Sequence, residues 1–183
     1  MLPFHDPAHR FRSAPSIETE RLVLRGFELS DLAYFVNFFA DADASRYVGG
    51  PNSSEDAWRR MLAGSALWQL TGIGMWAVTR RNDDTAIGHV GFFDFMRESD
   101  PSIIGEPEMG WILAPAAHGH GLAREACEAI LKWFEGHFGK RAIWALIAPG
   151  NERSMKLAAK LGFVRQADGT YKDKAETFWR RPA

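Results

Sequence analysis

Apolar and polar positions follow two periods along the chain, and these periods predict where helices and strands lie. Residues 21–25 alternate with a period of two, which is typical of a half-buried strand. The apolar residues of 32–39 recur every three or four positions, which is the period of an amphipathic helix. Ser53, followed three positions later by Asp56, resembles a capping box and predicts the start of a second helix.

The pattern predicts an α/β (α+β) protein. In chain order it gives a strand at 21–25, helices from Ser30 and from Ser53 to about 70, strands at 75–79, 86–93 and 109–113, a helix at 121–137, a strand at 142–147, a helix at 151–161, and strands from 163 and at 177–179. Residues 1–16 carry three prolines and no period, so we expect an N-terminal arm. Residues 17–183 contain no linker or repeat and are expected to form one domain.

Composition and charge exclude several classes of protein. Apolar residues make up 46% and charged residues 25% of the 183 residues, which is the balance of a packed soluble domain. Twenty-two Lys and Arg against 23 Asp and Glu give a formal net charge of −1, so no nucleic-acid partner is expected. No apolar run approaches the roughly 18 residues that span a bilayer, and residues 1–15 have no stretch of signal-peptide type. The lone cysteine, Cys127, fits a reducing compartment, so the expected location is the cytoplasm.

The most informative stretch is 111–123, where a predicted strand leads through a short two-glycine loop into a predicted helix. The first turn of a helix has N–H groups without intrahelical partners, and its dipole favours an anion. Gly119 and Gly121 stand just before that turn, where glycine lets the main chain approach a phosphate without an intervening Cβ. The spacing therefore predicts a phosphate-binding loop.

Two common phosphate motifs do not fit this chain. A dinucleotide fingerprint would need a third glycine or alanine where Arg124 stands. A P-loop would need Gly-Lys followed by Ser or Thr, whereas Gly139 and Lys140 are followed by Arg141.

The run His-Gly-His-Gly-Leu-Ala at 118–123 resembles the Gln/Arg-x-x-Gly-x-Gly/Ala loop with which GCN5-related N-acetyltransferases (the GNAT superfamily) hold the pyrophosphate of acetyl-CoA. His118 departs from that pattern at its first position. Other segments are similar in the same order to the ribosomal-protein N-terminal acetyltransferase (RimJ/RimL-type) branch: Thr-Glu-Arg-Leu at 19–22, Ile-Gly-His-Val-Gly at 87–91, Glu-Met-Gly-Trp at 108–111, and Asn-x-x-Ser to Lys-Leu-Gly-Phe at 151–163. The resemblance covers residues 17 to about 170.

The resemblance implies the GNAT fold, a central mixed, mostly antiparallel sheet flanked by helices, whose fourth and fifth strands splay apart. Residues 111–113 would lie in the fourth strand and 142–147 in the fifth, with the amide-rich pantetheine of acetyl-CoA pairing between them. The implied cofactor-binding residues are Trp111, Ile112, Leu113, His118, Gly119, His120, Gly121, Leu122, Ala123, Asn151, Ser154 and Lys156.

Two residues are candidates for the chemistry. Many family members use a tyrosine on the last helix as general acid, but Ala158 stands at the matching position. Ser154 is the nearest substitute for protonating a departing thiolate, and Glu108 is the candidate base, acting directly or through water. The same residues also have a structural interpretation. Asn151, three positions before Ser154, would be an ordinary N-cap of the helix, and Glu108 would be a solvent-facing strand residue.

The resemblance implies an acetyl-CoA-dependent N-acetyltransferase. Its partners would be acetyl-CoA and a primary amine, of a protein N-terminus or of a small molecule, which attacks directly in a ternary complex. A non-catalytic acyl-CoA-binding sensor is the alternative: the missing tyrosine slightly favours the sensor, whereas the pair of Ser154 and Glu108 favours the enzyme. His118 and His120 form a His-x-His pair, but a metal site would explain neither glycine, so no metal is expected. The acceptor, and the choice between monomer and homodimer, stay open.

Overall fold

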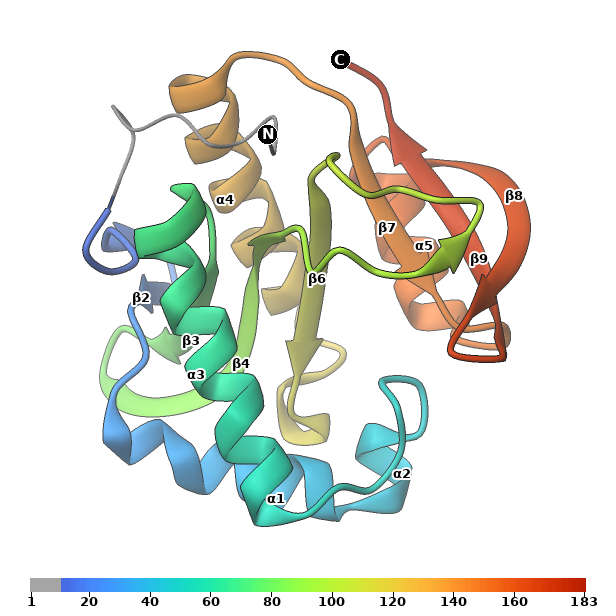
Figure 1. Cartoon of the computed structure of the whole chain (residues 1–183). Coiled ribbons are helices and arrows are strands. Elements are labelled where there is room, and N and C mark those ends of the chain that lie inside the picture. Colours follow the sequence, from blue (N-terminus) through green and yellow to red (C-terminus); the bar gives the residue numbers. More distant parts are fainter. Residues whose placement is uncertain (1–10) are drawn as a thin grey trace.

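The computed structural model describes residues 11–183, in which helices lie on both faces of a long sheet (Figure 1). The α-helices are α1 (Leu32–Ala40), α2 (Ala42–Ser45), α3 (Ser54–Thr71), α4 (Leu122–Phe138) and α5 (Glu152–Lys160). The strands are β1 (Ile17–Glu18), β2 (Leu22–Arg25), β3 (Met75–Arg80), β4 (Asp83–Phe93), β5 (Ser99–Asp100), β6 (Glu108–Leu113), β7 (Ile143–Ile147), β8 (Val164–Tyr171) and β9 (Lys174–Arg181). Single 3₁₀ turns at Leu29–Asp31 and Pro115–Ala117 precede α1 and α4.

Within residues 11–183 the strands form one sheet in the order β1-β2-β3-β4-β6-β7-β9-β8-β5. Neighbouring strands are antiparallel throughout, except that β6 and β7 are parallel. This mixed, mostly antiparallel sheet with flanking helices confirms the fold class expected from the sequence. The two strands expected to splay are β6 and β7.

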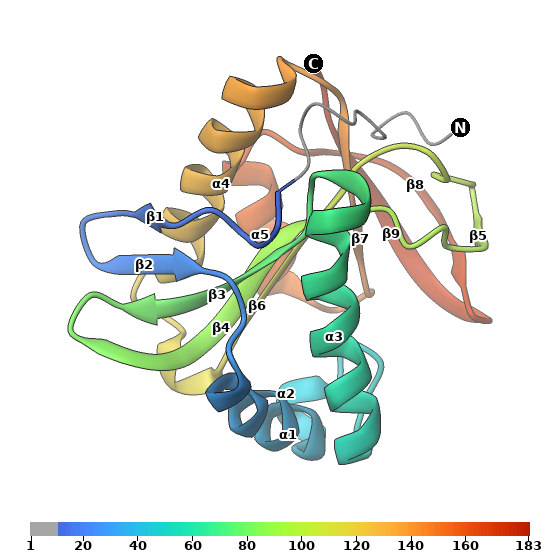
Figure 2. The same ribbon diagram turned by 60° about the vertical axis from the view of Figure 1, so that its left-hand side comes forward.

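Helices α1 and α3 cover one face of the sheet, and α4 and α5 cover the other (Figure 2). The larger core lies on the α4 side, where the ring of Phe134 packs 4.5 Å from that of Phe92 in β4. A second cluster joins α1 to α3 through Phe39 and Met61. The central strands β3 and β4 are therefore largely buried, whereas β8 is mostly exposed.

Local sequence signals set the ends of the long helices. Ser53 caps α3 as the pattern predicts, because its hydroxyl oxygen accepts a hydrogen bond from the Asp56 N–H at 3.1 Å. Gly72, with a φ of 80°, ends the same helix in the left-handed conformation. Helix α4 begins directly after Gly121, as the two-glycine loop predicts.

Two glycines let β4 approach both of its neighbours closely. A Cβ on Gly91 would lie 2.3 Å from the carbonyl oxygen of Gly74, and one on Gly88 would lie 2.6 Å from that of Ile112 in β6. Both obstacles are main-chain atoms, so no side-chain movement would relieve the clash. The two glycines therefore allow the main chain of β4 to lie close to Gly74, next to β3, and to β6.

Strands β6 and β7 are parallel but meet at one end only. Glu108 pairs with Trp144, and the Trp144 N–H donates to the Pro107 carbonyl at 2.8 Å. Beyond that pair, β6 continues to pair with β4, and β7 continues to pair with β9. The two strands therefore separate toward their C-terminal ends, as the expected splay requires (Figure 1). This unpaired stretch is called the β6–β7 divergence below; Glu108 marks its closed end.

The sequence pattern did not predict the shortest elements. Strands β1 and β5 have two residues each and α2 has four, too few to show a period. Residues 97–105, to which the sequence pattern assigns no element, contain β5, which pairs with β8, and the buried Ile103. Strand β5 was missed because two residues of strand leave no periodic signal.

Residues 11–16 belong to the expected N-terminal arm, of which residues 1–10 lie outside the described residues. The ring of Phe11 packs edge-on against Trp68 at 5.8 Å, and the Pro15 carbonyl accepts a hydrogen bond from Trp76 Nε1 at 2.7 Å. This part of the arm is thus attached to the core. In the part of the chain described, no helix combines the length and the apolar character needed to cross a bilayer.

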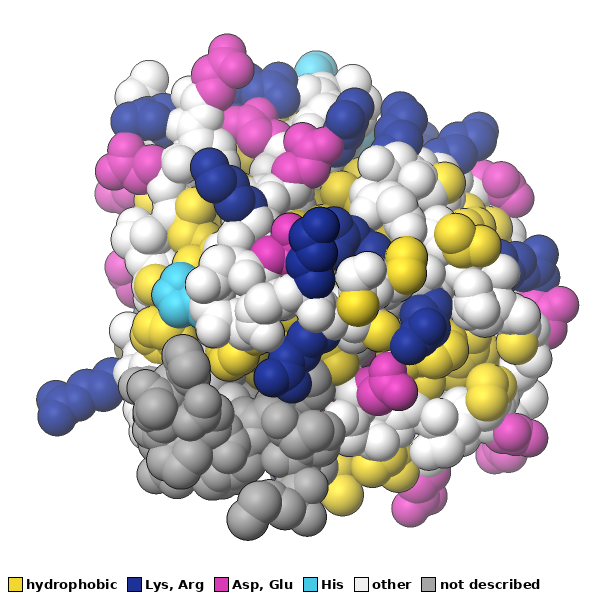
Figure 3. All heavy atoms as spheres, turned by 90° about the horizontal axis from the view of Figure 1, so that it is seen from above, with side chains coloured by type: hydrophobic (Ala, Val, Ile, Leu, Met, Phe, Trp, Pro, Cys, Tyr) yellow, Lys and Arg dark blue, Asp and Glu magenta, His cyan; other side chains and the backbone are white. Residues whose placement is uncertain are grey.

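Charged side chains of both signs cover the face seen from above in Figure 3. Lys and Arg side chains are spread over this face, with one group near its middle, and Asp and Glu lie among them. Arg181 of β9 and Glu135 of α4 form an ion pair of 2.6 Å between these two elements. Positive charge on this side is therefore partly neutralised within the protein.

Candidate functional site

The edge of β6 that faces β7 carries unpaired main-chain groups. In an antiparallel pair, successive residues alternately face the partner strand and point away from it. The Ala114 N–H donates to the Ile87 carbonyl at 2.8 Å, and the register between β4 and β6 is regular from there. By this alternation the main chains of Trp111 and Leu113 face the divergence, whereas that of Ile112 faces β4.

This edge suits an amide-rich ligand. Because β7 turns away, the N–H and C=O of Trp111 have no strand to pair with. The two amides of a pantetheine arm form the same hydrogen bonds that a neighbouring strand would form. The Trp111 side chain packs toward Phe163 on the α4 and α5 side, and Ile112 packs with the α1 cluster on the opposite face.

The loop between β6 and α4 fits a pyrophosphate. Gly119 and Gly121 have φ values of 83° and 75°, in the region that favours glycine. A Cβ on Gly119 would meet no heavy atom within 4 Å, and one on Gly121 would meet only Arg21 Nη2, at 3.7 Å. No side chain caps α4, so the first-turn N–H groups, including those of Leu122 and Ala123, have no side-chain partner from a cap. An anion is the complementary ligand for such a helix start.

The side chain of His118 makes contacts that the sequence did not predict. Its Nε2 lies 2.8 Å from the Leu113 carbonyl oxygen, and its Nδ1 lies 3.0 Å from Nη1 of Arg153 on α5. Because arginine only donates, Nδ1 accepts, and Nε2 carries the proton directed at Leu113. The ring therefore links the end of β6 to the first turn of α5. Among residues 11–183, no three His, Cys, Asp or Glu side chains are arranged to hold a metal ion.

Helix α5 begins shortly after β7, on the other side of the divergence. Asn151 caps it, with Oδ1 accepting from the Ser154 N–H at 3.3 Å, so the predicted N-cap is confirmed. Ser154 is half-buried, and its hydroxyl forms no hydrogen bond with the described residues. Lys156 is exposed on the same helix. Ala158 is fully buried, so the position at which the resemblance implies a tyrosine lies inside the core here.

Glu108 stands at the closed end of the divergence and is only 4% exposed. The interpretation of Glu108 as a solvent-facing residue is therefore wrong. Its Oε2 accepts a hydrogen bond of 2.6 Å from Arg97 Nε. Burial raises the pKa of Glu108 to about 7, although the positive charge of Arg97 opposes the rise. A carboxyl group with this pKa can take up and release a proton near neutral pH.

Arg97 is the partner that the sequence analysis missed. Its guanidinium carbon lies 4.6 Å from the ring centroid of Tyr171 and 5.6 Å from that of Phe93, so aromatic faces hold it beside Glu108. Burial also raises the pKa of Glu176 nearby, against the effect of Arg97. Arg97 lies in a segment without hydrophobic periodicity. Its position in the sequence therefore does not indicate that its side chain contacts Glu108.

Two other titratable groups are structural. His89 is buried, its ring stacks 4.8 Å from that of Phe35, and its Nδ1 lies 3.2 Å from the Tyr34 hydroxyl. Burial, with the positive charge of Arg60, lowers the pKa of His89 to about 3, so its ring stays neutral. Cys127 is fully buried in α4, and burial raises the pKa of its thiol, which makes it a poor nucleophile.

A cavity of about 700 Å³ lies between α1 and the start of β4, bordered by Ala114 and Pro115. It lies at the opposite end of β6 from Glu108, remote from the candidate base. A smaller cavity of about 370 Å³ lies beside the first turn of α5, lined in part by Glu152, Met155 and Glu176.

Known proteins place this chain in a family. Residues 21–164 match the family model for the acetyltransferase (GNAT) domain. The uncharacterized N-acetyltransferase YoaA of Bacillus subtilis is 27% identical over 154 residues, covering 83% of this chain and 84% of that protein. The crystal structure of an acetyltransferase from Agrobacterium tumefaciens shares 25% identity at a TM-score of 0.80, covering 92% of this chain and 94% of that one. RimL, a ribosomal L7/L12 α-N-protein acetyltransferase in complex with coenzyme A, shares the fold at 15% identity and a TM-score of 0.72, covering 92% and 98%.

The chain therefore belongs to the GNAT acetyltransferase family, as the sequence resemblance predicts. It is an acetyl-CoA-dependent acyltransferase.

We expect Gly121→Asp to abolish measurable CoA binding in isothermal titration calorimetry, because it adds a negative charge beside the proposed pyrophosphate site at the start of α4 and places a side chain at a φ of 75°. Gly136→Asp is the matched control: it adds the same charge to the exposed side of α4, where a Cβ has open space. Unchanged CoA affinity in Gly121→Asp would contradict the assignment of this loop to the pyrophosphate.

Proposed function

We propose that this protein transfers the acetyl group of acetyl-CoA to a primary amine, of a protein N-terminus or of a small molecule, by direct attack of the amine in a ternary complex. The observation that carries the proposal is Glu108, a buried carboxyl group with a pKa of about 7 at the closed end of the divergence. The unpaired edge of β6 accommodates the pantetheine, and the loop at 118–123 accommodates the pyrophosphate.

In the proposed step the amine nitrogen attacks the thioester carbon. The carbon–nitrogen bond forms, the carbon–sulfur bond breaks, and no covalent bond to the protein is made. Glu108 takes the proton that the amine loses, directly or through one water. Arg97 occupies Oε2 of Glu108, while no described residue donates a hydrogen bond to Oε1, which is left for the amine or the water.

The pKa of Glu108 favours an acceptor of low basicity. Moving a proton from an α-ammonium group of pKa about 8 to a carboxylate of pKa about 7 costs about 1.4 kcal/mol. The same transfer from a lysine side chain of pKa about 10.4 costs about 4.6 kcal/mol. An α-amine is therefore the better acceptor for this site.

Ser154 is proposed to protonate the departing thiolate or to order the water that does. Its hydroxyl is free of hydrogen bonds to the described residues, and it stands on the first turn of α5, beside the divergence. The fully buried Ala158 leaves no acid at the alternative position on this helix.

A thiol-release assay on the full chain tests the proposal. The panel contains a peptide with a free N-terminus, the same peptide blocked at its N-terminus but carrying a lysine, and small α-amines and alkylamines. We expect CoA release with free α-amines and much less with the blocked peptide. Tight CoA binding without thiol release for any amine would favour the non-catalytic sensor.

Glu108→Gln should change the pH profile of kcat/KM. In the unchanged enzyme the rising limb should have an apparent pKa of about 7, because the base works only when Glu108 is ionised. In Glu108→Gln the limb should move up to the pKa of the acceptor amine, with the largest loss at low pH. Glu106→Gln, at an exposed glutamate two residues earlier, is the control. An unaltered profile in Glu108→Gln would show that bulk water is the base.

Ser154→Ala should lower kcat about tenfold to a hundredfold, the low end of general-acid effects, because a thiolate of pKa about 8.5 already leaves readily. The KM for acetyl-CoA should change little, and the Asn151 cap should survive, since it uses the main-chain N–H of residue 154. Steady-state kinetics separate the two parameters. A rise in KM alone would make Ser154 a cofactor contact and nothing more.

A further inference from the structure

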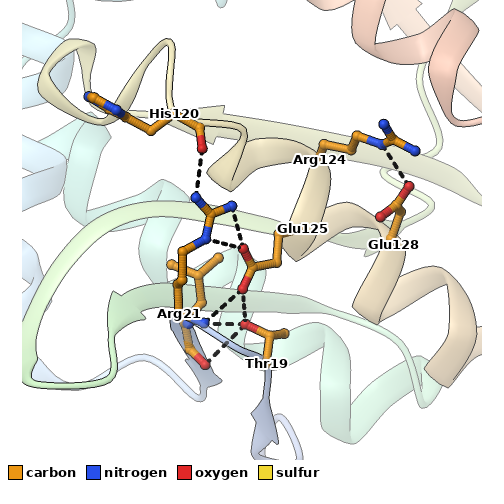
Figure 4. Close-up of polar contacts among 7 residues, drawn as sticks. Thr19, Arg21, His120, Arg124, Glu125 and Glu128 are labelled. Carbon is orange, nitrogen blue, oxygen red and sulfur yellow. Dashed lines mark hydrogen bonds and ion pairs between the residues drawn. The ribbon is translucent and has the colours of Figure 1, made fainter.

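The hairpin of β1 and β2 is tied to the start of α4 by a polar network that joins residues about a hundred positions apart (Figure 4). The Glu125 carboxylate, in the first turn of α4, accepts hydrogen bonds from the Thr19 hydroxyl at 2.6 Å and from the Arg21 N–H at 2.9 Å. The Arg21 side chain adds a bond of 2.7 Å from Nε to Glu125 Oε2. The same guanidinium donates from Nη1 to the His120 carbonyl at 2.9 Å.

Arg21 therefore holds a helix residue and a loop residue at once. Guanidinium is planar and presents its N–H donors in a fixed fork, so the Glu125 contact determines where Nη1 points. A lysine in the same place would keep the positive charge but would lack the fork. The contact with His120 therefore depends on the geometry of the Arg21 guanidinium as well as on its charge.

The His120 contact fixes the orientation of one peptide plane in the phosphate loop. In a trans peptide the C=O and the following N–H point in opposite directions. With the His120 carbonyl turned to Arg21, the N–H of Gly121 is directed away from Arg21. Gly121, which is part of this peptide, and Gly119, which precedes His120, both have positive φ, where glycine is permissive, so the local sequence alone does not fix the plane.

Arg21 also neutralises a charge that would oppose the cofactor. Glu125 lies one turn from the loop, where an unpaired carboxylate would repel a pyrophosphate. Burial would raise the pKa of Glu125, but hydrogen bonds from Thr19 and Arg21 lower it, so this carboxylate stays ionised and paired. Arg21 therefore both orients the loop, through the His120 carbonyl, and neutralises the charge of Glu125 at the start of α4.

We propose that Arg21 is a positioning residue for acetyl-CoA, which orients the His120–Gly121 peptide toward the pyrophosphate and masks the charge of Glu125. The proposal rests on the assignment of the pyrophosphate to the loop at 118–123. It gives the Thr-Glu-Arg segment a role in cofactor binding, although its residues lie outside that loop.

Arg81 supplies a matched control. Its guanidinium also holds the hairpin, through Nη1 to the Thr19 carbonyl at 2.7 Å and Nη2 to Glu18 Oε2 at 2.7 Å, and makes no contact with the loop. Arg21→Lys and Arg81→Lys therefore remove the same chemistry from the same hairpin. Only the first of them frees the His120 carbonyl.

The test measures dissociation constants by calorimetry for CoA and dephospho-CoA, which share the pyrophosphate, and by ligand-observed NMR for pantetheine, which lacks it. Arg21→Lys should weaken CoA and dephospho-CoA by the same factor, roughly tenfold, the loss expected for one misdirected charge-assisted hydrogen bond. Pantetheine binding should not change. Arg81→Lys should leave all three constants unchanged. Arg21→Gln, which keeps a side-chain amide donor but loses both the fork and the charge that masks Glu125, should show the same pattern with at least as large a loss and serves if Arg21→Lys does not fold.

Wild-type CoA affinity in Arg21→Lys, with binding abolished in Gly121→Asp, would overturn the positioning role and leave the loop assignment standing. Equal losses in Arg21→Lys and Arg81→Lys, or a parallel loss of pantetheine binding, would reduce Arg21 to a structural tie. Unchanged affinity in both Arg21→Lys and Gly121→Asp would remove the loop assignment itself.

Discussion

The structure depends on one constraint in its sheet: β6 and β7 are neighbours that pair only at Glu108 and Trp144. Each strand is held by its other neighbour, β6 by the close approach of β4 and β7 by five paired residues of β9. Neither can move to close the divergence without losing those bonds. The main chain of Trp111 is therefore left without a strand, inside an otherwise continuous sheet.

The two ends of the divergence have different chemistry for the same reason. At the closed end, the packed sheet excludes water, and burial raises the pKa of Glu108 toward neutrality. At the open end two helices begin, and the uncapped first turn of α4 offers N–H groups to an anion. His118 and Arg153 connect these helix starts, and Arg21 fixes the loop between them. A long ligand with an acyl thioester at one end and phosphates at the other matches this arrangement.

Much of this arrangement could be predicted from the sequence. The helical period and the Ser53 cap predicted α3 and α4 nearly to the residue, and Gly119 and Gly121 predicted the loop that ends where α4 begins, because helix period and positive φ are local properties. The contacts of Arg97 with Glu108 and of Arg21 with Glu125 could not be predicted, because they depend on how distant segments pack. The burial of Glu108 was missed for a related reason: alternation along β6 does not show that a loop folds over its first residue. Strand β5 was too short to leave a pattern.

Amide hydrogen exchange, followed with and without saturating CoA, tests the central claim most directly. If pantetheine pairs with the unpaired edge of β6, the Trp111 N–H should exchange quickly in the free protein and become protected when CoA binds. The Ile112 N–H, which faces β4, should be protected in both states. Exchange at Trp111 that does not change on CoA binding would contradict the account.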